Sequence, residues 1–146
     1  MSIKLSKIAS FFNHKVIGKD ISINNIVIDS REIKSGDLFV AIPGKNYDGH
    51  RFIAESINKG AAAILCNSSY DLQSITKPYI ECQDTIEALG QIALNYKRSL
   101  GSPFTIGITG TNGKTTVTKL TAEILKESYK VNTTIGNYNN DIGLPL

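Results

Sequence analysis

One stretch constrains this chain more than any other, the run FTIGITGTNGKTTVT at residues 104–118. It starts with a β-branched segment, residues 105–109, that is typical of a buried parallel strand. A glycine-rich turn follows at 110–113, and apolar residues at helical spacing then predict a helix that begins at Lys114. A strand, a glycine turn and a helix in this order are typical of a phosphate-binding loop.

The chemistry of such a loop follows from its geometry. Backbone N–H groups of the turn and of the helix N-terminus point toward an anion, and the helix dipole favours negative charge there. The Lys114 ammonium can reach the β- and γ-phosphates of a nucleotide, and the Thr115 hydroxyl can bind Mg²⁺. The usual motif would place its first glycine at position 108, which is Ile108, so this loop is a shorter form. A glycine turn without any ligand is the alternative interpretation.

Composition and charge exclude several classes of protein. The chain has 146 residues, 41% of them hydrophobic and 20% charged, which suits one ordinary globular domain or two small ones. Its net charge of +3 is spread along the chain and gives no support to nucleic-acid binding. No stretch reaches the roughly 18 apolar residues of a membrane span, and no signal-peptide core is present, so we expect a cytoplasmic protein. Cys66 and Cys82 lack metal or redox spacing and are expected to be buried and reduced.

The first hundred residues alternate between predicted helices and strands. Helical spacing indicates a short helix over 3–12, a second helix after Arg51, and a third that begins at the capping-box sequence 84–87. Apolar runs predict strands over 21–28 (interrupted by two asparagines), 38–42, 61–66 and 79–82. This alternation predicts an α/β fold.

A Gly-Ser-Pro sequence at 101–103 is the best candidate for a domain boundary. We therefore expect a first domain over 1–98, a linker over 99–103 and a second domain over 104–146, with a further strand at 130–134. A parallel sheet of two strands and one helix cannot cover both of its faces. The second domain is therefore expected to be incomplete and only marginally stable.

Three segments together resemble the Mur ligases, the ATP-dependent enzymes that form amide bonds in bacterial peptidoglycan synthesis. Asp29-Ser30-Arg31 and the later sequence at 48–50 look like the UDP-sugar-binding domain of the two later ligases of that pathway. TGTNGKTT at 109–116 matches the short family form of the phosphate loop. The Asn-rich segment 136–146 resembles the member that adds D-Ala-D-Ala to UDP-MurNAc-tripeptide, rather than the member that adds the third peptide residue.

The resemblance implies both an architecture and a reaction. A small α/β domain that binds the UDP-sugar is expected to precede the start of a parallel-sheet ATPase domain with a P-loop. In the family, the peptide carboxylate attacks the γ-phosphate of ATP, and the amine of D-Ala-D-Ala then attacks the resulting acyl phosphate. Mur ligases are considerably longer than this chain, so we expect it to be part of such a ligase and catalytically incomplete alone. We also expect a monomer.

The same resemblance assigns roles to individual residues. Lys114 and Thr115 are expected to act on the reacting phosphates, and Thr115 is the expected Mg²⁺ ligand. The residues expected to hold ATP are Gly110, Thr111, Asn112, Gly113, Lys114, Thr115 and Thr116. The candidates for binding UDP-MurNAc-tripeptide are Ser30, Arg31, Lys45, Asn46, Tyr47, Asn137, Asn139 and Asn140.

Each of these assignments has a structural alternative. Thr116 could cap the helix, Asp29-Ser30-Arg31 could be a turn with a surface ion pair, and residues 45–47 could form a solvated turn. Asn137, Asn139 and Asn140 could simply be turn residues, because asparagine is common in turns. For His50 we favour a structural role over contact with a ligand.

Other functions also stay open for the chain as a whole. It could be a module that binds UDP-muramyl-peptide or nucleotide without turnover, or belong to the ligase that adds the third peptide residue. An unrelated P-loop NTPase would need a carboxylate at a strand end after the helix, and only Asp141, in a predicted loop, follows it.

Overall fold

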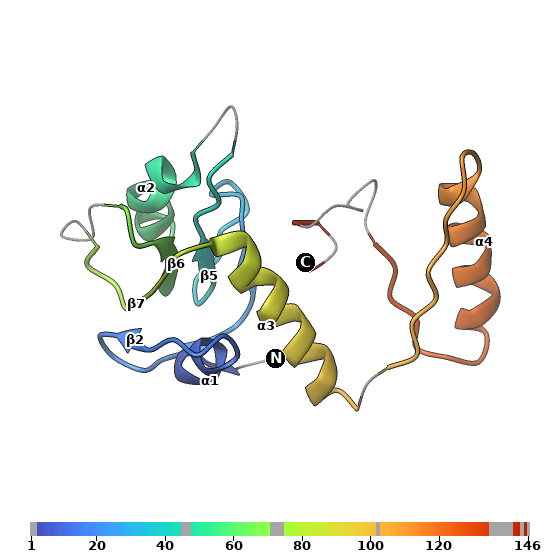
Figure 1. The fold of residues 1–146 in the computed structure, drawn as a ribbon, viewed down its shortest axis with the longest axis horizontal. Coiled ribbons are helices and arrows are strands. Elements are labelled where there is room, and N and C mark those ends of the chain that lie inside the picture. The colour runs from blue at the N-terminus through green and yellow to red at the C-terminus, as the bar shows by residue number, and fades with distance from the viewer. Residues whose placement is uncertain are drawn as a thin grey trace.

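A five-stranded sheet forms the centre of the first part of the chain (Figure 1). The computed structural model describes residues 3–44, 48–70, 75–101, 103–134, 142–143 and 145. The strand order is β2-β7-β6-β5-β4. Four of these strands pair in parallel: β4 (Ile26–Val27), β5 (Leu38–Val40), β6 (Ala63–Asn67) and β7 (Tyr79–Cys82).

The remaining strands are antiparallel and only two residues long. β2 (Val16–Ile17) pairs with β7 at the edge of the main sheet, and β1 (Ile3–Lys4) pairs with β3 (Ser22–Ile23) in a separate sheet. The single strand predicted over 21–28 is therefore wrong. Its two asparagines, residues 24–25, separate β3 from β4, which belong to different sheets.

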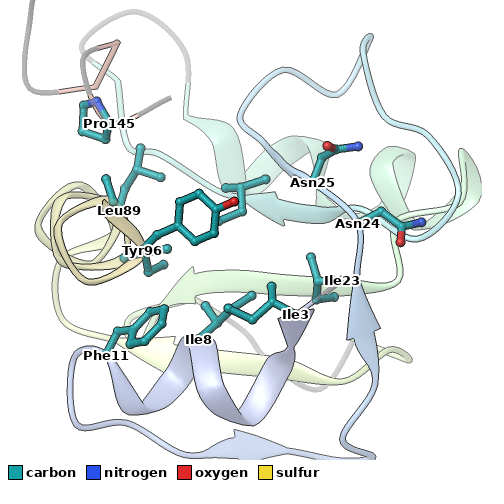
Figure 2. A pocket seen from close by; sticks show the side chains of 12 residues that line it. Ile3, Ile8, Phe11, Ile23, Asn24, Asn25, Leu89, Tyr96 and Pro145 are labelled. Carbon is teal, nitrogen blue, oxygen red and sulfur yellow. The ribbon is translucent and has the colours of Figure 1, made fainter. Parts of the chain in front are cut away.

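Helices cover both faces of the main sheet. α1 (Leu5–Ser10) and α3 (Thr85–Ser99) lie on one face, while η1 (Gly49–Phe52) and α2 (Ile53–Asn58) lie toward the other. A cleft of about 300 Å³ opens between α1 and α3 (Figure 2). Its lining is mainly apolar and includes Ile3, Ile8, Phe11, Asn24, Leu89, Tyr96 and Pro145.

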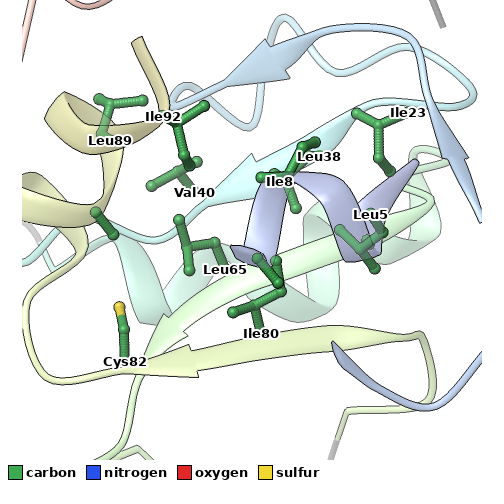
Figure 3. Packing of buried hydrophobic residues seen from close by; sticks show 13 residues of the cluster. Leu5, Ile8, Ile23, Leu38, Val40, Leu65, Ile80, Cys82, Leu89 and Ile92 are labelled. Carbon is green, nitrogen blue, oxygen red and sulfur yellow. The ribbon is translucent and has the colours of Figure 1, made fainter. Parts of the chain in front are cut away.

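Each face of the sheet has its own hydrophobic core. Side chains alternate along a strand, so Leu38 and Val40 of β5 enter one core while Phe39 enters the other. The larger core joins α1 and α3 to the sheet and is shown in Figure 3. The smaller core, beneath α2, consists of Ile33, Phe39, Ala41, Ile53, Ala61, Ile64 and Cys66. A parallel sheet buried on both faces confirms the predicted α/β class.

Helix α3 begins where its sequence predicts. The Asp84 carboxylate accepts hydrogen bonds from the backbone N–H groups of Ile86 and Glu87, at 2.8 and 3.1 Å. This satisfies two of the donors that a helix N-terminus leaves without an intrahelical partner.

The second part of the chain is less complete than the first. The predicted helix is confirmed as α4 (Lys114–Lys126), which Figure 1 shows standing away from the five-stranded sheet. The strands predicted at 105–109 and 130–134 are wrong, because neither segment is in a strand. A strand needs a neighbour to take its hydrogen bonds, and the described residues provide none here. The apolar side chains that a sheet would cover are exposed: Phe104, Ile106, Val117, Leu120, Ile124 and Tyr129.

None of the helices formed by the described residues has the length and apolar character needed to cross a membrane.

Candidate functional site

The turns that follow the parallel strands gather at one edge of the main sheet. Asp29-Ser30-Arg31 follows β4, Pro43 and Asp48 follow β5, and Asn67 is the last residue of β6. Ligands of α/β sheets bind at this carboxyl edge of the strands. The structure therefore places Ser30 and Arg31 where the sequence analysis expected a ligand.

The Arg31 side chain is held by the neighbouring Asp29. Its Nη2 donates to Oδ2 of Asp29 at 2.6 Å, and its Nε donates to Oδ1 and Oδ2 at 2.9 and 3.1 Å. The side-chain hydrogen bonds from Arg31 are the main reason that the pKa of Asp29 is lowered to about 2. The Arg31 side chain is 82% exposed. The turn with an ion pair is therefore present, and it presents an oriented guanidinium at the edge of the sheet.

Ser30 is buried rather than exposed, with 7% of its surface accessible. On α2, Glu55 accepts a hydrogen bond from Nζ of Lys59 at 2.6 Å. This bond is the main cause of a lowered pKa of Glu55, and the nearby Ser30 side chain contributes a smaller part. Ser30 therefore lies close to helix α2 and does not face solvent.

The turn after β5 is closed at its base. Pro43 and Asp48 form an antiparallel bridge, and the N–H of Gly49 donates to the carbonyl oxygen of Ile42 at 2.9 Å. The three residues inside this turn, predicted to contact the substrate, lie outside the described residues: Lys45, Asn46 and Tyr47.

His50 lies just behind this turn and is buried, with 4% of its surface exposed. Both ring nitrogens are engaged, one with Asp48 and one with the backbone of Asn67. This agrees with the structural role favoured from the sequence. The link to Asn67 was missed, because a contact between residues 17 positions apart leaves no local signal beyond the sequence at 48–50.

The phosphate loop has the predicted turn and helix. Gly113 has a φ of 79°, in the left-handed region that glycine adopts without strain, and α4 begins directly after it. The first helical hydrogen bond runs from the N–H of Val117 to the carbonyl oxygen of Gly113, at 2.9 Å. The N–H groups of residues 114–116 precede this bond, so they are oriented to meet an anion at the helix N-terminus.

Lys114 folds back over this loop. Its Nζ donates to the carbonyl oxygen of Gly110 and, at 3.4 Å, to that of Thr111. The hydroxyls of Thr115 and Thr116 are exposed, and neither has a hydrogen-bond partner among the described residues. The capping role considered for Thr116 is therefore not seen in that part of the chain. An exposed hydroxyl without a partner can take one position on a Mg²⁺ ion whose other ligands are phosphate oxygens and water.

The structure does not bring the two sets of candidate residues together. Figure 1 shows α4 well apart from the sheet edge that carries Ser30 and Arg31. The third predicted set, Asn137, Asn139 and Asn140, lies outside the described residues. Within the described ranges, no group of three or more His, Cys, Asp or Glu side chains could hold a metal ion.

The two cysteines take no part in either site. Cys66 belongs to the smaller core and Cys82 to the larger one, so the two thiols lie on opposite faces of the sheet. Both are buried and free of any disulfide, which agrees with the prediction. Burial raises the pKa of Cys66 to about 12 and that of Cys82 to about 11, so both remain thiols.

Comparison with known proteins identifies the family. The description "Mur ligase family, catalytic domain" matches residues 22–97, and "Mur ligase middle domain" matches residues 108–146. UDP-N-acetylmuramoyl-tripeptide–D-alanyl-D-alanine ligase of Buchnera aphidicola subsp. Acyrthosiphon pisum is 39% identical over 146 residues, which cover 100% of this chain and 31% of that protein. The chain thus spans about a third of the length of such relatives.

Solved structures give the same assignment. A crystal structure of MurF from Acinetobacter baumannii matches with a TM-score of 0.90 and 26% identity, over 99% of this chain and 32% of that one. The MurF ligase of Thermotoga maritima, solved in complex with ADP, matches with a TM-score of 0.68 and 33% identity, over 84% of this chain and 28% of that one. The α/β fold, the phosphate loop and these matches lead to one conclusion: the chain belongs to the Mur ligase family.

Proposed function

We propose that this chain is the substrate-binding and phosphate-binding part of a ligase that adds D-Ala-D-Ala to UDP-MurNAc-tripeptide at the expense of ATP. The observation that carries the proposal is the phosphate loop, where the Lys114 ammonium lies over a glycine turn at the start of α4. Two further findings support it: the name of the relative that matches the whole chain, and the ADP bound to the T. maritima structure.

The proposal divides the chain into two working parts. Residues 1–98 bind the UDP-linked peptide at the carboxyl edge of the sheet, residues 99–103 are a linker, and residues 104–146 begin the ATP-binding domain. At the sheet edge, the cationic guanidinium of Arg31 would meet the diphosphate, and Ser30 would hold the turn that carries it. The other proposed substrate contacts are Lys45, Asn46, Tyr47, Asn137, Asn139 and Asn140.

The phosphate loop would serve the activation of the peptide carboxylate. A carboxylate is a poor acyl donor because its leaving group would be oxide, and phosphorylation supplies a stable leaving group instead. The backbone of residues 110–113 would wrap the β- and γ-phosphates of ATP, and Lys114 would neutralise their charge. Thr115 would bind Mg²⁺, which when bound neutralises further phosphate charge, and Thr116 would add a donor in the first helical turn.

The second step needs the amine of D-Ala-D-Ala to attack the activated carbonyl while phosphate leaves. We assign neither the phosphate loop nor the described part of the sheet edge a role in binding that amine, and the chain covers only 31% of the Buchnera relative. We therefore propose that these 146 residues bind substrates without completing the reaction. ATP and UDP-linked precursors are cytoplasmic metabolites, so we propose the cytoplasm as the location. We also propose that the protein is a monomer.

A test must separate this proposal from its two alternatives, the ligase that adds the third peptide residue and a binding module without turnover. ADP release is measured with the protein expressed from its complete reading frame and with the 146-residue chain. The complete protein should release ADP only when both UDP-MurNAc-tripeptide and D-Ala-D-Ala are present. ADP release with UDP-MurNAc-dipeptide and a single amino acid would favour the first alternative. If the complete protein binds the substrates but releases no ADP, the second alternative, a binding module without turnover, is favoured. ADP release by the 146-residue chain alone would refute the proposal that this chain is catalytically incomplete.

A further inference from the structure

We propose that His50 is a positioning residue for the UDP-linked substrate. In this role it joins the turn after β5 to the end of β6 and so fixes the sheet edge at which that substrate binds. The proposal rests on the proposed function of that edge, and it assigns His50 no contact with the substrate.

The ring of His50 makes two directional hydrogen bonds. Its Nδ1 lies 2.6 Å from Oδ1 of Asp48, and the backbone N–H of Asn67 donates to its Nε2 at 2.9 Å. An atom that accepts from an N–H carries no proton of its own, so the ring proton belongs on Nδ1, where it donates to Asp48. The histidine is therefore held as a single neutral tautomer between two elements.

Two further contacts surround the segment that carries His50. The Tyr70 ring packs on the imidazole, with ring centroids 5.2 Å apart and planes inclined by 32°. At the preceding residue, a Cβ atom at Gly49 would lie 2.6 Å from the backbone nitrogen of Ile42, closer than real Cβ atoms come. The backbone just before His50 is therefore packed closely against the chain that leaves β5.

These contacts connect three strand ends. Asp48 forms the base of the turn after β5 through its bridge to Pro43. His50 links Asp48 to Asn67 at the end of β6, and Nδ2 of Asn67 donates to the carbonyl oxygen of Gln83, just after β7, at 2.8 Å. Loss of the imidazole would leave the turn after β5 without its side-chain link to the other two strand ends.

Asp48 is held by two hydrogen bonds from the same histidine. Its Oδ1 accepts from the backbone N–H of His50 at 3.0 Å and lies 2.6 Å from Nδ1 of the ring. The backbone bond is the main cause, and the side-chain bond the next, of a lowered pKa of Asp48, so the partner of the ring is a charged carboxylate.

Two variants separate the two bonds. His50→Phe keeps an aromatic ring against Tyr70 but loses both hydrogen bonds. His50→Gln can still accept from Asn67 but lacks the ring that packs against Tyr70. Ile92→Val is the matched control. Ile92 is 3% exposed in the larger core, on the opposite face of the sheet from α2, so shortening it should lower stability without changing the contacts of His50.

The experiment uses the protein expressed from its complete reading frame, with steady-state kinetics and calorimetric titration of UDP-MurNAc-tripeptide. For His50→Phe we expect KM and Kd for this substrate to rise about tenfold, the usual consequence of leaving a buried donor unpaired. The KM for ATP and kcat at saturation should change less than about twofold. For His50→Gln, which can still accept the hydrogen bond from Asn67, the rise in KM and Kd should be smaller than for His50→Phe.

The possible failures can be told apart. If the wild type does not bind UDP-MurNAc-tripeptide, the proposed function fails. If the wild type binds and His50→Phe binds equally well, the positioning role is wrong and the proposed function stands. A KM change in Ile92→Val as large as that in His50→Phe would also overturn the proposal, because it would reflect stability alone. Should His50→Phe not fold, His50→Gln decides: a rise in KM and Kd larger than that in Ile92→Val supports the positioning role, and values equal to those of the wild type overturn it.

Discussion

We expect nucleotide binding to depend more on Lys114 than on any other side chain of the loop. Its ammonium is already positioned over the loop by the carbonyl oxygens of Gly110 and Thr111, so little side-chain entropy remains to be lost when phosphates arrive. The same two carbonyls would release it only for a stronger acceptor. Phosphate oxygens are such acceptors, since hydrogen bonds between ionised groups are shorter and stronger than those to neutral ones.

We expect Lys114→Ala to weaken ADP binding about tenfold to a hundredfold, the range for loss of a hydrogen bond to a charged group. The measurement is calorimetric titration of ADP into the protein from the complete reading frame. Lys119→Ala is the control, because it removes the same charge from an exposed position on α4 outside the loop. Unchanged affinity in Lys114→Ala, or an equal loss in both variants, would contradict the phosphate-loop assignment.

The pair between Asp29 and Arg31 should be visible in acid unfolding. The pKa of Asp29 falls from 3.8 to about 2 on folding, so the pair contributes stability that is fully present above pH 3.8. That contribution is lost as the pH falls toward 2, where the folded protein also binds the proton. Urea unfolding should therefore show wild type and Asp29→Asn differing most near neutral pH and converging at low pH. A difference between the two that is constant with pH would show that the pair does not perturb Asp29.

Helix α4 is present where the sequence predicts it, but the strands predicted at 105–109 and 130–134 are absent. The reason is that helices and strands find their hydrogen-bond partners in different places. A helix pairs its own backbone groups within the segment, so the pattern after Lys114 was sufficient to predict it. A strand pairs with another segment, and β-branched residues at 105–109 cannot supply that partner. The same dependence explains β2, which the sequence did not reveal, because two residues are too few to show an alternating pattern.

The exposure of this element leads to a prediction about its stability. α4 has 13 residues, and its outward side chains include Leu120 at 60% and Ile124 at 71% exposure. Isolated helices of this length are marginal in water. Hydrogen exchange of the 146-residue chain should therefore be fast over 104–134 and slow in β5, β6 and β7. Equal protection in α4 and β6 would mean that the second part of the chain is as well packed as the first.

At the scale of the whole molecule, the sequence predicted local elements better than it predicted contacts between distant segments. The turn after β4 and the glycine turn before α4 were both found from local patterns. The burial of Ser30 near α2, and the hydrogen bond from Asn67 to His50, arise only when α2 and β6 pack beside these turns. Such contacts have no signature in a short stretch of sequence, so the sequence could not predict them.

We propose that the carboxyl edge of the sheet binds the UDP-linked peptide while the loop before α4 binds ATP. Hydrogen exchange read by mass spectrometry tests this most directly, on the protein from its complete reading frame with each ligand in turn. UDP-MurNAc-tripeptide should protect peptides that cover residues 29–31 and 48–50, and ATP should protect those that cover 110–116. Protection by UDP-MurNAc-tripeptide confined to the cleft between α1 and α3, in peptides covering 3–11 and 89–96, would contradict the account.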